Sequence, residues 1–285
     1  MKKIISLVMA IVVCLLSFAS CSGPTKVKVN GTKIDNEVYT YFDDMYEGDE
    51  EKTEKAISRY VTVNTEFSIR NLTLTASQKS KLAQDVDDLW HIYGAYYKEI
   101  GVSKQTFYKI KTSKAYEDAL LEYYYGPNGY EPVSEDALKE YFKKNYIAIS
   151  YATEYLFNFD ETGALVPMTN EEKTVITDEI SRAVGLINTG SLIEETTEKE
   201  VQEAIINSAN DGNFPSGFYK EVSNIKVGSA GMVTLNDYVF LVERIDVFDE
   251  EYNYYDEYRT TCLRAAKGKD FEKLIDTWSQ NYVVN

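Results

Sequence analysis

Histidine and cysteine are nearly absent from this sequence, which has one histidine and three cysteines in 285 residues. The histidine, His91, lies in "DLWHIYGAYY", a segment with apolar residues at helical spacing, where a lone histidine is more often packed or solvated than catalytic. The sequence contains no H-E-x-x-H motif, no paired-cysteine ligand motif and no phosphate-binding glycine loop. It therefore indicates no metal site and no cofactor site.

The first residues carry the three parts of a secretion signal, namely Lys2 and Lys3, an apolar run over 4–18, and small residues. The run is shorter than the roughly 18 apolar residues of a spanning helix. Phe18-Ala19-Ser20-Cys21 resembles a bacterial lipobox, in which the cysteine is acylated and becomes the new N-terminus. We therefore expect a signal peptide over 1–20 and a lipid anchor on Cys21 at the extracytoplasmic face of a bacterial membrane. A plain cleavable signal or an uncleaved anchor is the alternative.

The positions of the cysteines then exclude an internal disulfide. Cys14 lies in the segment that would be removed, and Cys21 would carry lipid, so Cys262 is the only cysteine left in the mature domain. The chain that remains is long enough to bury a hydrophobic core without such cross-links.

Basic residues are fewer than acidic residues, 30 against 46, so the formal net charge is -16. A chain this acidic is repelled by phosphate backbones, which excludes nucleic acid as a partner. Adjacent carboxylates such as Asp43-Asp44 are expected by chance among 46 acidic residues and are interpreted as solvated surface. Tyrosine is abundant at 24 residues, and we expect most of these rings to pack against helix faces.

The first half of the mature chain has helical character after a short hairpin. Val27 and Val29 alternate with lysines before Asn30-Gly31, a strong signal for a tight turn. Asp35 can cap a helix that begins near Asn36, and helical spacing continues over about 52–70, 76–100 and 104–125.

The second half mixes helices and strands beyond "GPNGYEP", residues 126–132, which is the best candidate for a domain boundary. Ser134 can cap a helix, "AISYATEYLFNF" has the composition of a strand, and 231–247 predicts a hairpin broken at Asn236-Asp237. Segments 169–190 and 198–209 are interpreted as helices, and a last helix is expected over about 255–282 before "YVVN". This order predicts an α+β fold.

The order of segments resembles the SurA/PrsA family of extracytoplasmic foldases. "VKVNGTKIDNEVYTYF" is similar to the opening of the family, "VSEDALKEYFKKNY" to its linker helix, and "NIKVGSAGMVTLNDYVFLVERID" to the end of its parvulin-type prolyl isomerase domain. The resemblance implies a helical chaperone lobe over 21–132, a linker helix with a parvulin-like domain over 133–248, and a C-terminal helix over 249–285 that returns to the first lobe. In that arrangement "YVVN" pairs with "KVKVN".

The sequence departs from the family at the isomerase site. In active parvulins, histidines stand in contexts such as A-S-H-I-L and G-Y-H-I-I. Here the matching positions are Glu154 in "ATEYLF" and Val239 in "DYVFLV", and the glycine-rich segment is reduced to "GNFPSGFY". The resemblance therefore implies a degenerate parvulin domain whose isomerase chemistry is lost or greatly weakened.

Three functions follow from this interpretation. The first is a lipid-anchored, foldase-like chaperone that binds unfolded or nascent secreted polypeptides. The second is an active peptidyl-prolyl isomerase with a rearranged site, and the third is a non-catalytic lipoprotein of an envelope complex.

Overall fold

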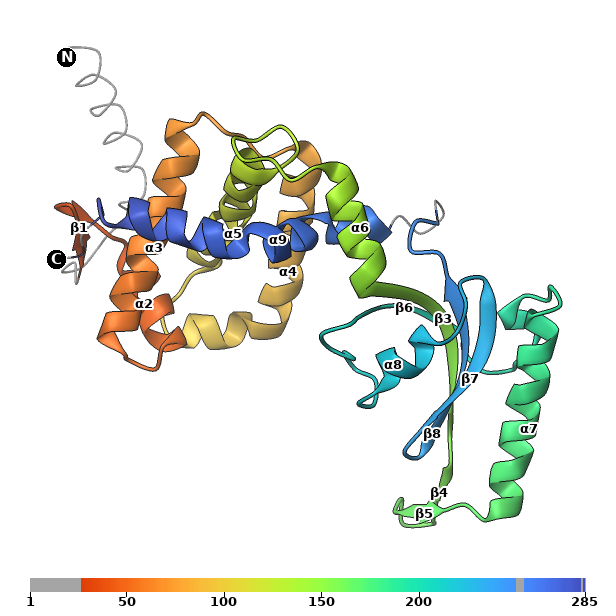
Figure 1. The fold of residues 1–285 in the computed structure, drawn as a ribbon. Coiled ribbons are helices and arrows are strands. Elements are labelled where there is room, and N and C mark those ends of the chain that lie inside the picture. Colours follow the sequence, from red (N-terminus) through yellow and green to blue (C-terminus); the bar gives the residue numbers. More distant parts are fainter. Residues whose placement is uncertain (1–26, 250–253, 283, 285) are drawn as a thin grey trace. The chain divides into compact units, whose positions relative to one another are not determined.

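The structure, a computed structural model, describes residues 27–249, 254–282 and 284, so Cys21 and the lipobox lie outside the described residues. The chain divides into two compact units (Figure 1). The first unit draws on the residues up to Ser134 and from Leu263 onward, and the second comprises Glu135–Cys262.

The first unit opens with the hairpin that the sequence predicts. Strand β1 (Lys28–Val29) pairs with β2 (Thr32–Lys33) in antiparallel register, with Val29 opposite Thr32. Asn30 and Gly31 form the two-residue turn, both with positive φ (48° and 79°), which asparagine and glycine tolerate best.

Four helices follow, close to the segments that the apolar spacing indicates: α2 (Asn36–Met45), α3 (Glu50–Ile69), α4 (Ala76–Glu99) and α5 (Lys104–Tyr125). Each begins at a polar side chain that accepts a backbone N–H of the first turn, namely Asp35, Asp49, Thr75 and Ser103. Thr75 forms a complete capping box with Gln78.

The long helix α9 (Tyr254–Ser279) contributes its last part to the first unit. Phe271 and Ile275 are fully buried there. Arg59 of α3 pairs with Glu272, and the Ser58 hydroxyl donates to the carbonyl of Tyr282 at 2.9 Å. The ends of the described chain meet in an isolated antiparallel bridge between Val29 and Val284.

The second unit contains a four-stranded antiparallel sheet in the order β6-β3-β8-β7. Its strands are β3 (Tyr146–Tyr155), β6 (Gln202–Asn207), β7 (Ser229–Leu235) and β8 (Tyr238–Ile245). Helix α6 (Glu135–Asn145) leads into β3, and a small hairpin of β4 (Phe157–Phe159) and β5 (Leu165–Pro167) follows it. The remaining elements are α7 (Asn170–Ile187), a 3-10 turn (Ile193–Glu195) and α8 (Phe218–Ser223). The α+β fold class is confirmed.

The helix expected over 198–209 is wrong, because this segment forms β6. A short apolar run such as "AII" fits a strand or a helix equally well, and tertiary pairing decides between them. Here β6 runs antiparallel to β3, with Ile206 buried opposite Ile147.

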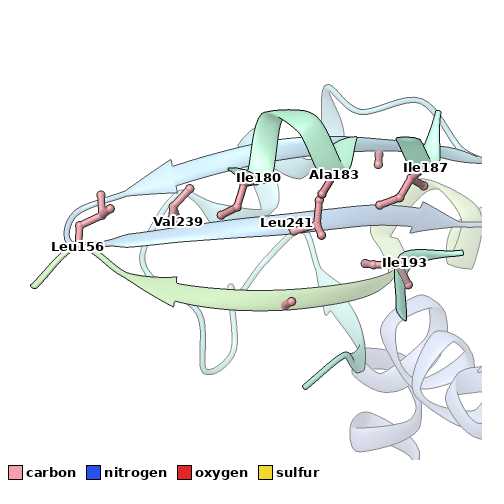
Figure 2. Close-up of a cluster of buried hydrophobic side chains, with 9 residues drawn as sticks. Leu156, Ile180, Ala183, Ile187, Ile193, Val239 and Leu241 are labelled. Carbon is pink, nitrogen blue, oxygen red and sulfur yellow. The ribbon is translucent and has the colours of Figure 1, made fainter. Parts of the chain in front are cut away.

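The sheet has two covered faces, with α7 on one side and α8 on the other (Figure 1). On the α7 side, Ile180, Ala183 and Ile187 pack against Val239 and Leu241 of β8 (Figure 2). On the α8 side, Phe218 and Val222 pack against a second buried cluster that includes Phe240. Neighbouring residues of a strand therefore belong to different sides of the sheet.

Candidate functional site

The α8 side of the sheet carries an open groove of about 870 Å³. Most of its lining residues come from β3, β6, β8 and the loop before α8, and Asn236 of the β7–β8 turn and Tyr258 of α9 complete the lining. Tyr151 and Thr153 contribute from β3, and Tyr238 and Phe240 contribute from β8. Each strand contributes alternate residues because the side-chain period of a strand is two.

Aromatic rings form the apolar part of the groove. Phe214 stacks on the buried Phe218 with 4.2 Å between ring centroids and an interplanar angle of 3°. Tyr151 meets Phe214 edge-on at 5.0 Å, and Phe240 lies 6.0 Å from both Phe214 and Tyr238. Tyr151, Phe214 and Tyr238 are only partly buried, so these rings remain within reach of a ligand.

The loop that presents Phe214 is held by the carboxylate of Asp211. This carboxylate accepts the backbone N–H groups of Gly217 at 2.9 Å and Tyr219 at 2.6 Å, and so anchors the start of α8. Gly217 has a φ of 94°, where a side chain would be strained. The segment "GNFPSGFY", which resembles the remnant of a glycine-rich family motif, thus shapes one wall of the groove.

The polar groups that line the groove include the Tyr151 hydroxyl and the carboxylates of Glu203 and Asp211. The Tyr151 hydroxyl donates to the Gln202 side chain at 2.8 Å, and burial raises the pKa of Tyr151 above its ordinary value. Among the described residues that line the groove there is no histidine. A general acid or base needs a pKa near the operating pH, and a tyrosine with a raised pKa does not meet this condition.

Strand β6 forms one rim of the groove and is an edge of the described sheet, where it pairs with β3 alone among the named strands. An edge strand presents backbone N–H and C=O groups that an extended polypeptide can meet. The arrangement therefore offers apolar rings beside a strand edge, which is the combination that main-chain recognition with side-chain pockets requires.

The structure brings the two predicted parvulin positions together. Glu154 of β3 lies opposite Val239 of β8 in the antiparallel register. Val239 is fully buried in the α7-side cluster (Figure 2), and Glu154 shares the face of Ala152 and Leu156, which belong to that cluster. Glu154 forms an ion pair with Lys199 at 2.9 Å. Neither position lines the groove.

The groove residues next to these positions, Thr153 and Phe240, are themselves a cross-strand pair. Motif matching alone missed them, because it placed the site on the positions one residue further along β3 and one residue earlier on β8. The period of two could have identified them, since residues that flank a buried apolar position face the other side of the sheet.

His91 and Cys262 lie elsewhere. His91 is exposed on α4 in the first unit. Cys262 is a free, fully buried thiol on α9, and burial raises its pKa to about 11, so it is a packing residue and a poor nucleophile. Within the described ranges, no group of three or more histidine, cysteine or acidic residues is placed to hold a metal ion. No helix among the described residues is long and apolar enough to cross a membrane.

Several solved structures are similar to this chain. No family model matches the chain, and no curated protein matches it. The foldase PrsA of Streptococcus pneumoniae is 12% identical over 84% of this chain and 87% of that chain, with a TM-score of 0.44. PrsA of Lactococcus lactis is 11% identical over 92% and 94%, with a TM-score of 0.42. A SurA-like chaperone structure from Campylobacter jejuni is 13% identical over 92% and 98%, with a TM-score of 0.34. These matches are to the PrsA and SurA group that the sequence motifs resemble.

Proposed function

We propose that this chain is an extracytoplasmic, lipid-anchored chaperone of the foldase type, which binds unfolded secreted polypeptides without strong isomerase activity. The observation that carries the proposal is the aromatic groove beside the edge strand β6. Partly buried rings of Tyr151, Phe214 and Tyr238 give an unfolded segment apolar contact area. The strand edge gives it main-chain hydrogen bonds that do not depend on sequence.

Such a groove favours weak and reversible binding of many clients. Folded proteins bury most of their aromatic and aliphatic side chains, so only unfolded segments can insert them between the rings. An extended segment loses backbone entropy of about 1–2 kcal/mol per ordered residue, which offsets much of the gain from the contacts. The expected result is an affinity high enough to prevent aggregation and low enough to release the client.

The second part of the proposal is that isomerase activity has been lost. Rotation about the X-Pro bond has a barrier of about 18–20 kcal/mol, and each tenfold acceleration requires about 1.4 kcal/mol of selective transition-state stabilisation. Thr153 and Phe240 are the cross-strand pair that faces the groove, and neither can supply the paired imidazoles of an active parvulin. Glu154 and Val239, the positions that the motifs indicate, face the other side of the sheet.

The third part is the lipid anchor on Cys21, which rests on the lipobox-like sequence alone. An anchored chaperone meets polypeptides as they leave the membrane. Two or more acyl chains give stable attachment where one would be marginal.

An aggregation assay tests the chaperone. The full-length chain in nanodiscs should suppress the aggregation of several unrelated unfolded proteins, and Phe214→Ala should reduce this protection. Phe159→Ala is the matched control, because Phe159 is 65% exposed on β4 and does not line the groove. Protection of a single partner only would favour the envelope-complex subunit, and equal protection by the Phe214→Ala variant would exclude the groove as the client site.

A further inference from the structure

The first unit has a cleft of about 800 Å³, and none of its lining residues belongs to the groove of the second unit. It lies among α2, α3, α5 and the last part of α9. Tyr41, Phe42 and Met45 of α2 line one part of it, and Met45 is 52% exposed. This part of the cleft is apolar and open to a ligand.

The charge of the cleft is opposite to that of the protein. The chain has a formal net charge of -16, yet most of the charged side chains that line the cleft are positive. They are Lys52, Lys55, Arg59, Lys111, Lys114 and Arg264. The carboxylates that line it are Glu117, Glu272 and Asp276. A local excess of positive charge in an acidic protein favours an acidic ligand at this place over the rest of the surface.

Two of the three carboxylates of the cleft, Glu117 and Glu272, are already engaged. Glu117 accepts hydrogen bonds from Arg59 at 3.0 Å, Lys114 at 2.7 Å and Arg264 at 3.2 Å. Glu272 accepts hydrogen bonds from both terminal nitrogens of Arg59, at 2.5 and 2.9 Å. These pairs satisfy the two arginines and Lys114. Of the other lysines, Lys52 forms an ion pair with Asp49 at 2.8 Å, and Lys55 is exposed to solvent.

Lys111 differs from the other lysines of the cleft. It is half-buried on α5, and its ammonium group lies 5.0 Å from the ring centroid of Phe107. No carboxylate among the described residues forms an ion pair with it, and burial lowers its pKa. A partly desolvated ammonium without a counter-charge is unfavourable, and a ligand carboxylate would relieve that cost.

We propose that this cleft binds acidic segments of client polypeptides, with a ligand carboxylate paired to Lys111 and a neighbouring apolar side chain packed against the α2 wall. The inference rests on the proposed function in one respect, because it names the class of segment that a client presents. Charge complementarity selects an acidic peptide over a neutral one, and the apolar wall of Tyr41, Phe42 and Met45 selects a peptide over a bare anion.

Calorimetric titration of the full-length chain in phosphatidylcholine nanodiscs tests the proposal with two blocked peptides, Ac-AEFLEA-NH2 and Ac-AQFLQA-NH2. The glutamate peptide should bind about tenfold more tightly, as expected for one charge-assisted contact. Lys111→Met keeps the aliphatic stem and should abolish this preference. Lys79→Met removes the same charge from an exposed position on α4 and should leave the preference unchanged. Tryptophan fluorescence checks that the variants fold, because Trp90 and Trp278 both lie in the first unit.

Two results would overturn the inference. Equal binding of the two peptides would remove the acidic preference while leaving the proposed chaperone function intact. Binding of phenylacetate as tightly as the glutamate peptide would show that the cleft takes a small acid rather than a polypeptide. If neither peptide bound and no client were protected from aggregation, the proposed function itself would fail.

Discussion

Glu154 and Val239 face each other across strands β3 and β8, and their side chains belong to the face that α7 covers. Val239 is thus part of the packing between the sheet and α7. Glu154 lies on the same face of the sheet and forms an ion pair with Lys199. The groove lies on the opposite face, where Thr153 and Phe240 are the corresponding pair. A polypeptide in the groove would contact the second pair.

We expect Glu154→Ala to leave proline isomerisation at the rate of the uncatalysed reaction, as in the unchanged protein. The side chain of Glu154 is 23% exposed, and that of its partner Lys199 is 52% exposed, so the loss of the ion pair should cost no more than about 1 kcal/mol of stability. A proline-peptide assay with purified protein measures the rate. Robust turnover that falls sharply in this variant would establish a rearranged enzyme instead.

Leu241→Ala should destabilise the second unit by about 2–5 kcal/mol, because Leu241 is 2% exposed in the cluster beneath α7 and its loss leaves a cavity. The control Val175→Ala, on α7, removes a side chain that is 66% exposed and should change stability by less than about 0.5 kcal/mol. Hydrogen exchange in β3 and β8 reports the difference. Equal protection in the two variants would contradict the assignment of this core.

Deletion of the chain from Asp270 onward should loosen the first unit more than the second. It removes the buried Phe271 and Ile275, the partner of Arg59, and the Val29–Val284 bridge. The loss exposes apolar surface and leaves a partly buried guanidinium with one carboxylate fewer. Hydrogen exchange should show α3 and α5 opening first, and loosening confined to the second unit would argue against this role of α9.

The stability of the first unit should fall in acid because of Glu117. Burial raises the pKa of this carboxyl, but hydrogen bonding to Lys114 and the charge of Arg59 lower it more, so the net shift is below the ordinary value of 4.5. A depressed pKa contributes stability that is present above pH 4.5 and is lost as the pH falls through the folded-state value.

Glu117→Gln should therefore cost about 1–3 kcal/mol near neutral pH, and the cost should shrink as the pH falls below the ordinary value of the carboxyl. Urea unfolding followed by tryptophan fluorescence measures it, since both tryptophans belong to the first unit. Glu99→Gln, at an exposed position on α4, is the control and should show no such dependence on pH. A cost that stayed constant in acid would mean that the charge of Glu117 does not contribute.

Cys21→Ser should abolish acyl labelling and membrane partitioning of the chain. Two or more acyl chains hold a protein at a membrane far more strongly than an unmodified polypeptide end. Growth with labelled palmitate, followed by fractionation, measures both. Labelling that persisted in the Cys21→Ser variant would remove the basis for the anchor, and labelling lost only in Cys262→Ser would assign the lipid to a different residue.

The sequence by itself determined the elements whose signals are local. Asn30-Gly31 predicted its turn, Asp35 and Ser103 predicted helix starts, and Asn236-Asp237 predicted the turn between β7 and β8, because each depends on backbone preferences within a few residues. The α+β class followed from the order of these elements.

Only the tertiary structure decided the features that depend on partners far apart in the chain. Segment 202–207 became a strand because β3 offers it a ladder of hydrogen bonds, although its local pattern also suits a helix. The groove formed on the side of Thr153 rather than Glu154 because α7 and α8 cover different faces of the sheet. Glu117 is paired because α3 and α9 bring Arg59 and Arg264 to it. Lys111, on the same helix, forms no ion pair with a carboxylate of the described chain. Such long-range pairing leaves no mark in a short stretch of sequence.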